Sequence, residues 1–375
     1  MKKLLFLIIT LFVSLLAPGQ ENLNKLLPVR GICLSAPDPE GLDQFIDFIN
    51  KELVPRKINT LVIRIGYKYK YKSHPELSSE NALSKKEVKK IVKACENGNI
   101  RIIPQINLLG HQSSRNRLGN LLKAYPEFDE TPHIIMPEEY AWPNPDGLYC
   151  KSYCPLHPGV HKVVFDVVDE IVDVFKTNAF HAGMDEVFYL GNDKCSRCQG
   201  RDKAELFAGE VTKIRNHLAQ NNIELWIWGD RLLDGRATGI GLWEASYNNT
   251  QRAIDMIPKD VVINDWHYER PDPTAAYFAL KGFKVVTCPW RFPDVTKTQL
   301  HMMVNFKKYA TPAVKDNYQG MLHTIWTGSE NFINQFYGRE EVQSSRGGNW
   351  VEAFKILVDE INKLDPDKYL EYEKK

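Results

Sequence analysis

Two adjacent carboxylic acids, Asp185 and Glu186, follow a short segment of small and apolar residues, AFHAGM, at residues 179–184. That segment is typical of a buried parallel strand. Neighbouring residues on a strand point to opposite faces, so burying both acids inside the strand would be costly. Where a strand gives way to a loop, the same pair can face a substrate, and one of the acids can donate a proton to it. We therefore interpret the pair as a candidate catalytic centre; the alternative is an acidic pair that begins a helix.

Aromatic and polar side chains also follow the other predicted strands. If the strands form a barrel, their carboxyl ends meet at one face. Aromatic rings can stack on the C–H surface of a sugar, while carboxylates bind its hydroxyl groups. We predict a sugar-binding mouth made of His111, Trp228, Asp230, Trp266, Tyr268, Trp290 and Trp326. A purely structural role stays open for His111, Trp226 and Trp243, and is expected for His181 inside its strand.

The cysteines form a second group with possible chemistry. Two close pairs, Cys150 with Cys154 and Cys195 with Cys198, fall in loops after successive strands. Four thiolates at such spacings could hold a structural zinc ion, whereas one or two disulfides are the alternative in an exported protein. No histidine-rich cluster accompanies the acids, so no cofactor is expected for catalysis. The remaining cysteines, Cys33, Cys95 and Cys288, are expected in the core.

The elements that must position these residues alternate regularly along the chain. Helical patterns of apolar residues separate eight β-rich runs. The runs are 29–36, 60–67, 101–110, 179–185, 224–230, 261–268, 284–290 and 320–326, and the helical segments are 41–54, 85–99, 157–177, 203–221, 246–257, 272–281, 297–310 and 348–364. Eight strand–helix units predict an α/β fold, a closed (β/α)₈ TIM barrel. An open doubly wound sheet is the alternative, but no Gly-rich phosphate loop follows any strand.

A long irregular segment, residues 111–156, follows the third predicted strand, and a loop of this length is usually functional. No repeat or low-complexity linker interrupts the chain. We predict a single catalytic domain over residues 25–370.

The charge balance narrows the choice of partners. The 375 residues carry 48 basic and 47 acidic side chains, a net charge of +1. No surface for nucleic acid or an anionic membrane is indicated, so a glycan or oligosaccharide is the expected partner. Residues 1–20 combine two lysines, an apolar run and a short small-residue region, which is typical of a secretory signal peptide. We expect a secreted or periplasmic protein with no membrane span in the mature chain; its oligomeric state is not indicated.

Several segments, in order, resemble one enzyme family. HAGMDE at 181–186 is similar to the His-x-Gly-Gly-Asp-Glu motif of family 20 glycoside hydrolases, the β-N-acetylhexosaminidases. IIPQINLLGHQS at 102–113 resembles that family's Ile-Pro-Glu-Ile-Asp-x-Pro-Gly-His segment. Arg30-Gly31 resembles its opening strand, and LHTIWTGSE at 322–330 resembles its closing strand.

The resemblance implies a mechanism and a division of labour. Glu186 would be the general acid that protonates the glycosidic oxygen and later activates water. Asp185 would orient the 2-acetamido group of the substrate, whose carbonyl oxygen attacks the anomeric carbon. This is substrate-assisted, retaining hydrolysis. Repulsion between the adjacent acids is also expected to raise the pKa of one of them.

The sequence departs from the family pattern at positions that bind sugar hydroxyls. Leu34-Ser35-Ala36 stands where the family has an arginine, and Gly66-Tyr67-Lys68-Tyr69 replaces Asp-Gly-Trp-Arg. Trp290-Arg291-Phe292-Pro293-Asp294 replaces a Tyr-x-Asp motif, so Tyr268 is a candidate to supply the missing hydroxyl. Gly328 stands where an acid is expected, with Glu330 displaced. Two alternatives therefore stay open: a glycosidase of altered sugar specificity, and a non-catalytic carbohydrate-binding relative.

Overall fold

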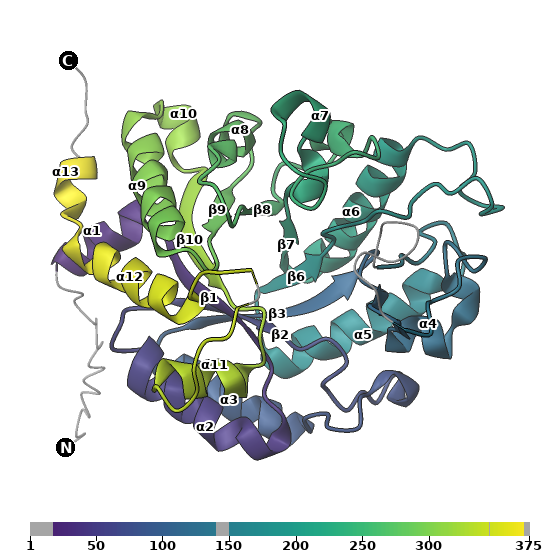
Figure 1. Cartoon of the computed structure of the whole chain (residues 1–375), viewed down its shortest axis with the longest axis horizontal. Coiled ribbons are helices and arrows are strands. Elements are labelled where there is room, and N and C mark those ends of the chain that lie inside the picture. Colours follow the sequence, from purple (N-terminus) through teal and green to yellow (C-terminus); the bar gives the residue numbers. More distant parts are fainter. Residues whose placement is uncertain (1–17, 140–149, 345, 371–375) are drawn as a thin grey trace, which may run out of the picture.

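Eight parallel strands close into a barrel in the computed structural model, which describes residues 18–139, 150–344 and 346–370 (Figure 1). The strands are β1 (Val29–Ser35), β2 (Thr60–Arg64), β3 (Arg101–Leu108), β6 (Ala179–Gly183), β7 (Glu224–Trp228), β8 (Val262–Trp266), β9 (Val285–Cys288) and β10 (Tyr318–Thr324). Around the ring they pair in sequence order, and β1 closes it by pairing with β10. The predicted TIM barrel is confirmed, and each strand lies within or close to its predicted run.

Helices cover the outside of the barrel because each presents an apolar stripe to the strands. They include α2 (Leu42–Phe48), α3 (Lys85–Asn97), α5 (Val160–Phe175), α6 (Lys203–Ala219), α8 (Thr274–Leu280), α9 (Pro293–Tyr309), α11 (Ser329–Phe336) and α12 (Trp350–Lys363). In α5, Val160, Val164, Val167 and Ile171 are buried along one face. A capping box of Ser84 and Glu87 begins α3.

The prediction of a helix over 246–257 is wrong. Only a short 3₁₀ turn, Gln251–Asp255, forms there. The Ser246 hydroxyl accepts a hydrogen bond from the backbone N–H of Thr250 at 3.1 Å and donates one to Asn248 Oδ1 at 3.0 Å. Short polar side chains that bond to nearby groups in this way compete with helix formation.

The barrel interior is filled by side chains, as in a packed core. Val62, Ile103, Trp226, Val286 and Leu322 belong to one buried cluster contributed by five strands. Trp226 is therefore a core residue. Cys33, Cys95 and Cys288 are also buried, as predicted.

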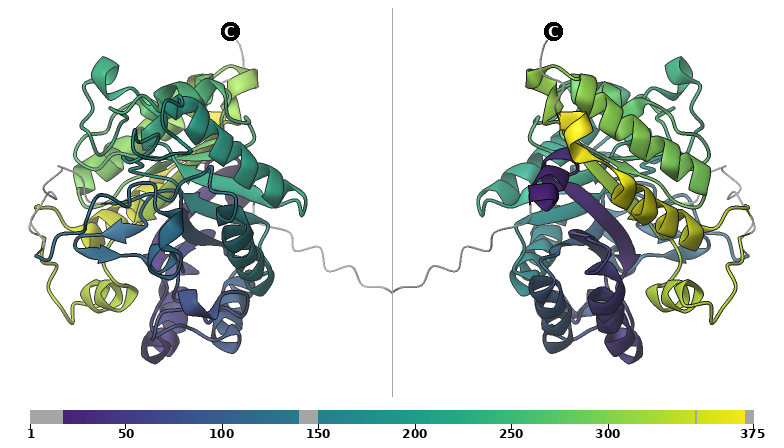
Figure 2. Two further views of the ribbon diagram at one scale, coloured as in Figure 1. Left: turned by 90° about the vertical axis from the view of Figure 1, so that its right-hand side faces the viewer. Right: turned by 90° about the vertical axis from the view of Figure 1, so that its left-hand side faces the viewer.

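The two ends of the described chain lie side by side on the outside of the barrel (Figure 2). The helix α1 (Pro18–Leu26) packs next to α13 (Pro366–Leu370), and Asn22 Nδ2 donates to Asp367 Oδ1 at 2.5 Å. Leu23 and Leu26 of α1 are buried, so the packed body begins before residue 25. The predicted signal peptide lies mostly outside the described residues, since these begin at Pro18.

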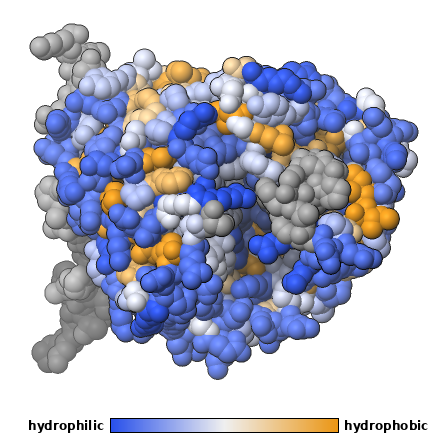
Figure 3. Space-filling model, in the orientation of Figure 1, coloured by the Kyte–Doolittle hydropathy of each residue, from blue (hydrophilic) through white to orange (hydrophobic). Residues whose placement is uncertain are grey.

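The long segment after β3 contains short regular elements. It contains the antiparallel pair β4 (Ser113–Ser114) and β5 (Arg117–Leu118), then α4 (Asn120–Ala124). Residues 140–149 of this segment lie outside the described part. Among the described helices, none has the length and apolar character required to cross a membrane. The face shown in Figure 3 is largely hydrophilic, with apolar residues in small separate patches.

Candidate active site

Asp185 and Glu186 lie directly after β6, where the backbone adopts an unusual conformation. Met184 has φ 69° and Glu186 has φ 48°, both in the left-handed region that residues with a side chain rarely occupy. His111, after the neighbouring strand β3, has φ 54°. Gly183 has φ 68°, and a Cβ atom there would lie 2.5 Å from Asn107 Oδ1, so only glycine fits. Such conformations persist where surrounding contacts enforce them, often at functional sites.

His111 lies between the two acids. Its Nε2 atom is 3.0 Å from Asp185 Oδ2 and 3.3 Å from Glu186 Oε2. We call these three residues the acid cluster. Burial disfavours a charged imidazole, but the charge of Asp185 and hydrogen bonds to both acids outweigh it, so the pKa of His111 lies well above its usual value.

The same contact acts on Asp185 in the opposite direction. Burial disfavours its ionised form, but the charge of His111 and the hydrogen bond from it leave the pKa of Asp185 below its usual value. Repulsion from Glu186 therefore does not raise the pKa of Asp185, because a histidine separates the two carboxylates.

Asp230 stabilises the acid cluster through hydrogen bonds. Its Oδ2 accepts hydrogen bonds from the Glu186 backbone N–H at 2.9 Å and from Arg231 Nε at 2.7 Å, and its Oδ1 accepts one from Trp266 Nε1 at 3.2 Å. Burial raises the pKa of Asp230 to about 6, against the opposing charge of Arg231. Asp230 thus fixes the backbone of Glu186 and the ring of Trp266.

This arrangement corrects two predicted substrate contacts. Asp230 and Trp228 are both buried and do not line the pocket. Asp230 is turned toward backbone and side-chain donors of the protein. The indole of Trp228 packs against His181 and Trp326 inside the barrel, with ring centroids 4.5 and 5.8 Å away. His181 itself is buried in β6 and accepts a hydrogen bond from the Gly183 N–H.

The acid cluster opens into a pocket of about 810 Å³ at the carboxyl ends of the strands. Aromatic side chains also line this pocket: Trp243, Trp266, Tyr268, Trp290 and Trp326. The Tyr268 ring lies 4.9 Å from that of Trp266 and 5.2 Å from that of Trp290. Trp326 Nε1 donates to the Tyr268 hydroxyl at 2.9 Å. Burial keeps the pKa of Tyr268 well above its usual value, so the hydroxyl stays protonated.

Several buried polar atoms of the lining have no hydrogen-bond partner within the described residues. They are Asp185 Oδ1, Arg64 Nε, Trp290 Nε1 and Arg291 Nε. Buried polar groups are normally paired. One acceptor and three donors at the edge of a pocket can be satisfied by a ligand with both hydroxyl and amide groups.

The geometry agrees with a family assignment. A model of the catalytic domain of glycosyl hydrolase family 20 matches residues 57–345, well over half of the chain. The chain belongs to glycosyl hydrolase family 20.

Relatives within family 20 are distant. A β-hexosaminidase of Akkermansia muciniphila is 28% identical over 163 residues, which cover 40% of this chain and 30% of that protein. A β-hexosaminidase of Porphyromonas gingivalis is 26% identical over 274 residues, which cover 68% of this chain and 32% of that protein. The chain thus spans about a third of the length of these relatives. The structure of a Flavobacterium johnsoniae chitobiase is similar in fold, with a TM-score of 0.59 at 18% identity, covering 89% of this chain and 50% of that chain.

Arg64 is a pocket residue that the sequence analysis missed. At the end of β1, Leu34-Ser35-Ala36 stands where family 20 has a sugar-binding arginine, and Ser35 pairs in register with Arg64, the last residue of β2. Arg64 Nη2 donates to Ser35 Oγ at 2.8 Å, and its guanidinium lies 4.6 Å from the Trp326 ring centroid. An arginine at the end of an apolar strand was the available signal.

The acidic residue that lines the pocket also differs from the one expected. Glu330 does not line the pocket, and its Oε1 accepts a hydrogen bond from the Asp38 backbone N–H at 2.8 Å. Glu269, from the segment after β8, lines the pocket instead and pairs with Arg291 at 2.6 Å. No sequence pattern indicated Glu269, because its position depends on how that loop folds back.

The cysteines divide differently from the prediction. Cys150 Sγ lies 3.2 Å from the Glu186 backbone carbonyl oxygen, to which it donates, and burial raises the pKa of the Cys150 thiol to about 12. The other three, Cys154, Cys195 and Cys198, form a group with Glu130 whose ligand atoms all lie within 4.8 Å of one another. We call these four the thiol cluster. The predicted set of four cysteines is thus corrected, since Cys150 belongs beside the acids.

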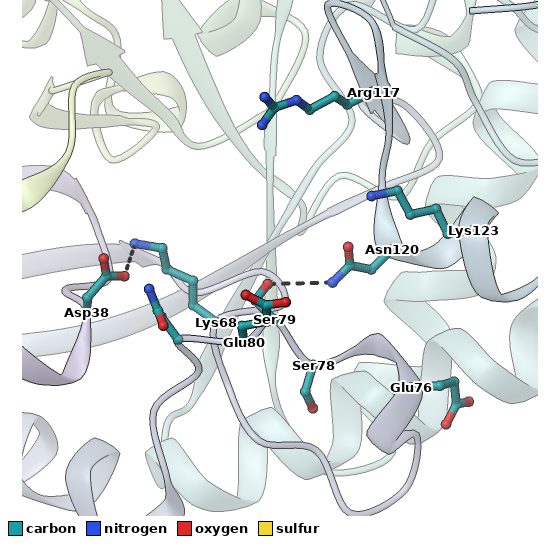
Figure 4. Close-up of a pocket in the computed structure, with 10 residues that line it drawn as sticks. Asp38, Lys68, Glu76, Ser78, Ser79, Glu80, Arg117, Asn120 and Lys123 are labelled. Atoms are coloured by element: carbon teal, nitrogen blue, oxygen red, sulfur yellow. Dashed lines mark hydrogen bonds and ion pairs between the residues drawn. The ribbon is translucent and has the colours of Figure 1, made fainter.

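A second hollow, of about 740 Å³, lies among the loops after β1, β2 and β3 (Figure 4). Lys68 pairs with Asp38 at 2.8 Å, and Asn120 reaches Ser79. Arg117 and Lys123 come from the segment after β3. Its lining has no aromatic ring and no buried orphaned polar atom, so it lacks the features that distinguish the acid pocket.

Proposed function

We propose that this family 20 chain is a β-N-acetylhexosaminidase-like glycosidase that removes terminal 2-acetamido sugars. The observation that carries the proposal is the state of Asp185. Its Oδ2 is held by His111, whereas its Oδ1 is buried and has no hydrogen-bond partner among the residues that the structure describes. An amide N–H of the substrate is the donor that suits this atom, since an ionised carboxylate only accepts hydrogen bonds.

The reaction follows from that placement. Glu186 donates its proton to the glycosidic oxygen, and the leaving group departs as an alcohol. The carbonyl oxygen of the acetamide bonds to the anomeric carbon as the glycosidic bond breaks, while Asp185 holds the acetamide N–H and balances the developing positive charge. The carboxylate of Glu186 then takes a proton from water as the water oxygen attacks the anomeric carbon. The bond between that carbon and the acetamide oxygen breaks, which restores the acetamide and releases the sugar with its original configuration.

Other lining residues suit the remaining groups of the sugar. The protonated hydroxyl of Tyr268 can donate to the acetamide oxygen. Arg64, Trp290 and Arg291 offer N–H groups for ring hydroxyls. The chemistry uses side chains and the substrate's own nucleophile, so it requires no cofactor. The expected structural zinc would take no part in it, because Cys154, Cys195 and Cys198 do not line the pocket.

A glycosidase of altered sugar specificity is the second candidate. It is favoured by the replaced hydroxyl-binding positions, where Arg64 and Glu269 stand in for residues from other strands. The two candidates differ in what Asp185 binds.

Matched aryl glycosides test both. Aryl β-N-acetylglucosaminide and β-N-acetylgalactosaminide are expected to be hydrolysed, and the aryl β-glucoside and β-galactoside are not. A thiazoline analogue of the acetamido sugar should inhibit, and Glu186→Gln should abolish turnover. Hydrolysis confined to sugars without the acetamido group supports the second candidate. Tight glycan binding with no turnover of any substrate indicates a non-catalytic binding protein.

We also propose that the protein is exported. The support is the pattern of residues 1–20, with two lysines before an apolar run. N-terminal sequencing of the protein from its native cells is expected to find the mature chain starting near residue 21 in the periplasm or medium. A chain beginning at Met1 and confined to the cytoplasm contradicts the proposal.

A further inference from the structure

The thiol cluster is a closed, buried set of metal-ligand atoms away from the acid pocket. Glu130, Cys154, Cys195 and Cys198 are all buried, and none of them lines that pocket. Cys154 Sγ lies 3.3 Å from Cys198 Sγ and 3.6 Å from Cys195 Sγ. We propose that these four residues bind a structural zinc ion that joins the loop after β3 to the loop after β6.

Glu130 supplies the first argument for a cation. Its side chain is fully buried, at 0% exposure. One carboxylate oxygen accepts a hydrogen bond from the Asn192 backbone N–H at 3.0 Å, but Oε2 has no hydrogen-bond partner in the part of the chain that the structure describes. A buried carboxylate needs a paired charge or a metal to offset its lost hydration. The nearby thiols lie where such a metal would be shared.

The sulfur separations supply the second argument. A disulfide requires an S–S distance of about 2.0 Å. Thiolates bound to one tetrahedral zinc at about 2.3 Å lie roughly 3.8 Å apart, which is close to the two separations in this cluster. Cys154 approaches both of the other thiols, so a disulfide with one would leave the other thiol outside the bond.

The number and type of ligands indicate which metal binds and whether the site is structural or catalytic. Three thiolates and one carboxylate suit zinc better than the hard cations calcium and magnesium. Four protein ligands complete a tetrahedral shell and leave no open position, which is typical of a structural site.

The site would reinforce contacts that already join the two loops. The Cys154 backbone N–H donates to the Phe128 carbonyl at 2.7 Å, and that of Glu130 donates to the Ser152 carbonyl at 3.1 Å. These bonds fold the segment after β3 onto itself, and Asn192 connects it to the segment after β6. The same two segments carry His111 and the acids Asp185 and Glu186. The metal would therefore fix their relative position without touching the substrate.

Metal analysis of the full chain, purified without reductant or added metal, tests the proposal. We expect one zinc per chain and seven free thiols after denaturation with a chelator, since the sequence has seven cysteines. On the folded protein, a mercurial thiol reagent should release the zinc, as measured with a chromogenic chelator. A chain with fewer than seven thiols and no metal is a disulfide protein, and seven free thiols without metal mean an empty thiol cluster; either result overturns the proposal.

Variants identify the ligands. Cys198→Ser and Glu130→Gln should lose zinc during dialysis against a chelator concentration that leaves the unmodified protein loaded. Cys150→Ser is the matched control, because its thiol faces the Glu186 carbonyl, and it should keep one zinc per chain. Loss of zinc from Cys150→Ser with retention in Glu130→Gln would show that the ligand set is the one first predicted from the cysteine spacing. Release from the unmodified protein keeps the test decisive if a variant fails to fold.

Discussion

The acid cluster and the thiol cluster join the same two loops, those after β3 and β6, but only the acid cluster lines a pocket. In the acid cluster, His111 and Asp230 hold the acids from two sides, and the carboxylates of Asp185 and Glu186 lie at the pocket. In the thiol cluster, all four side chains are buried and face one another. The same pair of loops can therefore form both a site that is open to a ligand and a closed site that holds the two loops in position.

Cys150 and Cys154 show how sharply the two regions are divided. They are four residues apart, yet Cys150 donates to the Glu186 carbonyl and Cys154 lies against Cys198. Variants of the acid cluster should therefore mainly lower activity, whereas variants of the thiol cluster should mainly lower stability.

The largest effect is expected for Glu186→Gln. The amide cannot donate a proton as an acid does, so kcat/KM for an aryl N-acetylglucosaminide should fall by about 10²–10⁴. Zinc content and the unfolding temperature should stay close to those of the unmodified protein. Unchanged turnover would show that Glu186 is not the general acid. It would also contradict the assignment of catalysis to the acid cluster.

The next effect concerns the thiol cluster, through Cys198→Ser. Loss of a structural metal removes binding energy that belongs to folding. We expect a loss of about 2–4 kcal/mol, seen as a fall in Tm of roughly 3–5 °C by calorimetry. A chelator should lower the Tm of the unmodified protein and leave that of the variant unchanged. If the chelator has no effect on either, the cluster contributes no metal-linked stability.

Arg64→Lys tests whether Arg64 binds the sugar in the pocket. Lysine keeps the charge but cannot donate to Ser35 Oγ and also present an N–H group in the geometry of Arg64 Nε. Loss of a charged hydrogen bond to the sugar should lower kcat/KM by about 10–100-fold. The decrease should be smaller for a substrate that lacks the hydroxyl group that Arg64 binds, and an equal decrease for both would contradict a direct contact.

The pairing of His111 and Asp185 should appear in the pH dependence of stability. The raised pKa of His111 stabilises the folded state fully below about pH 6.5, its unfolded value, and this contribution is lost as the pH rises through the folded pKa. The lowered pKa of Asp185 contributes above about pH 4 and is lost as the pH falls through its folded value. The difference in unfolding free energy between the unmodified protein and His111→Asn should therefore be greatest between about pH 4 and 6.5. Denaturant titrations across this range measure it, and a flat difference would mean that His111 is neutral.

Cys150→Ser should have the smallest effect. A serine hydroxyl can still donate to the Glu186 carbonyl, so turnover should fall by less than about threefold, and the unfolding free energy should change by less than about 1 kcal/mol. Cys150→Ala removes the donor and should lower turnover more than Cys150→Ser. Equal activity of the two variants would show that the hydrogen bond does not position the acid.

The fold could be predicted from the sequence because each strand is a short apolar run, and a helix or loop separates it from the next. The acids were predicted because Asp185 and Glu186 are adjacent and immediately follow β6. The failures arose where position in the chain does not determine side-chain direction. Trp228 ends β7 but turns into the barrel, and Asp230 turns toward the Glu186 N–H.

Glu130 was missed for a related reason. It is 24 residues from Cys154 along the chain and has no cysteine beside it, so no spacing pattern includes it. It reaches the thiols because the segment after β3 folds back, with Glu130 hydrogen-bonded to Ser152. Contacts of this kind depend on tertiary structure and carry no local signal.

The neighbouring positions of α1 and α13 have a practical consequence. Because Asn22 contacts Asp367, a short linker could connect the two ends of the described body without crossing the ring of strands. The polypeptide could then be reopened in an exposed loop far from both clusters, giving a circular permutant with all eight barrel strands retained.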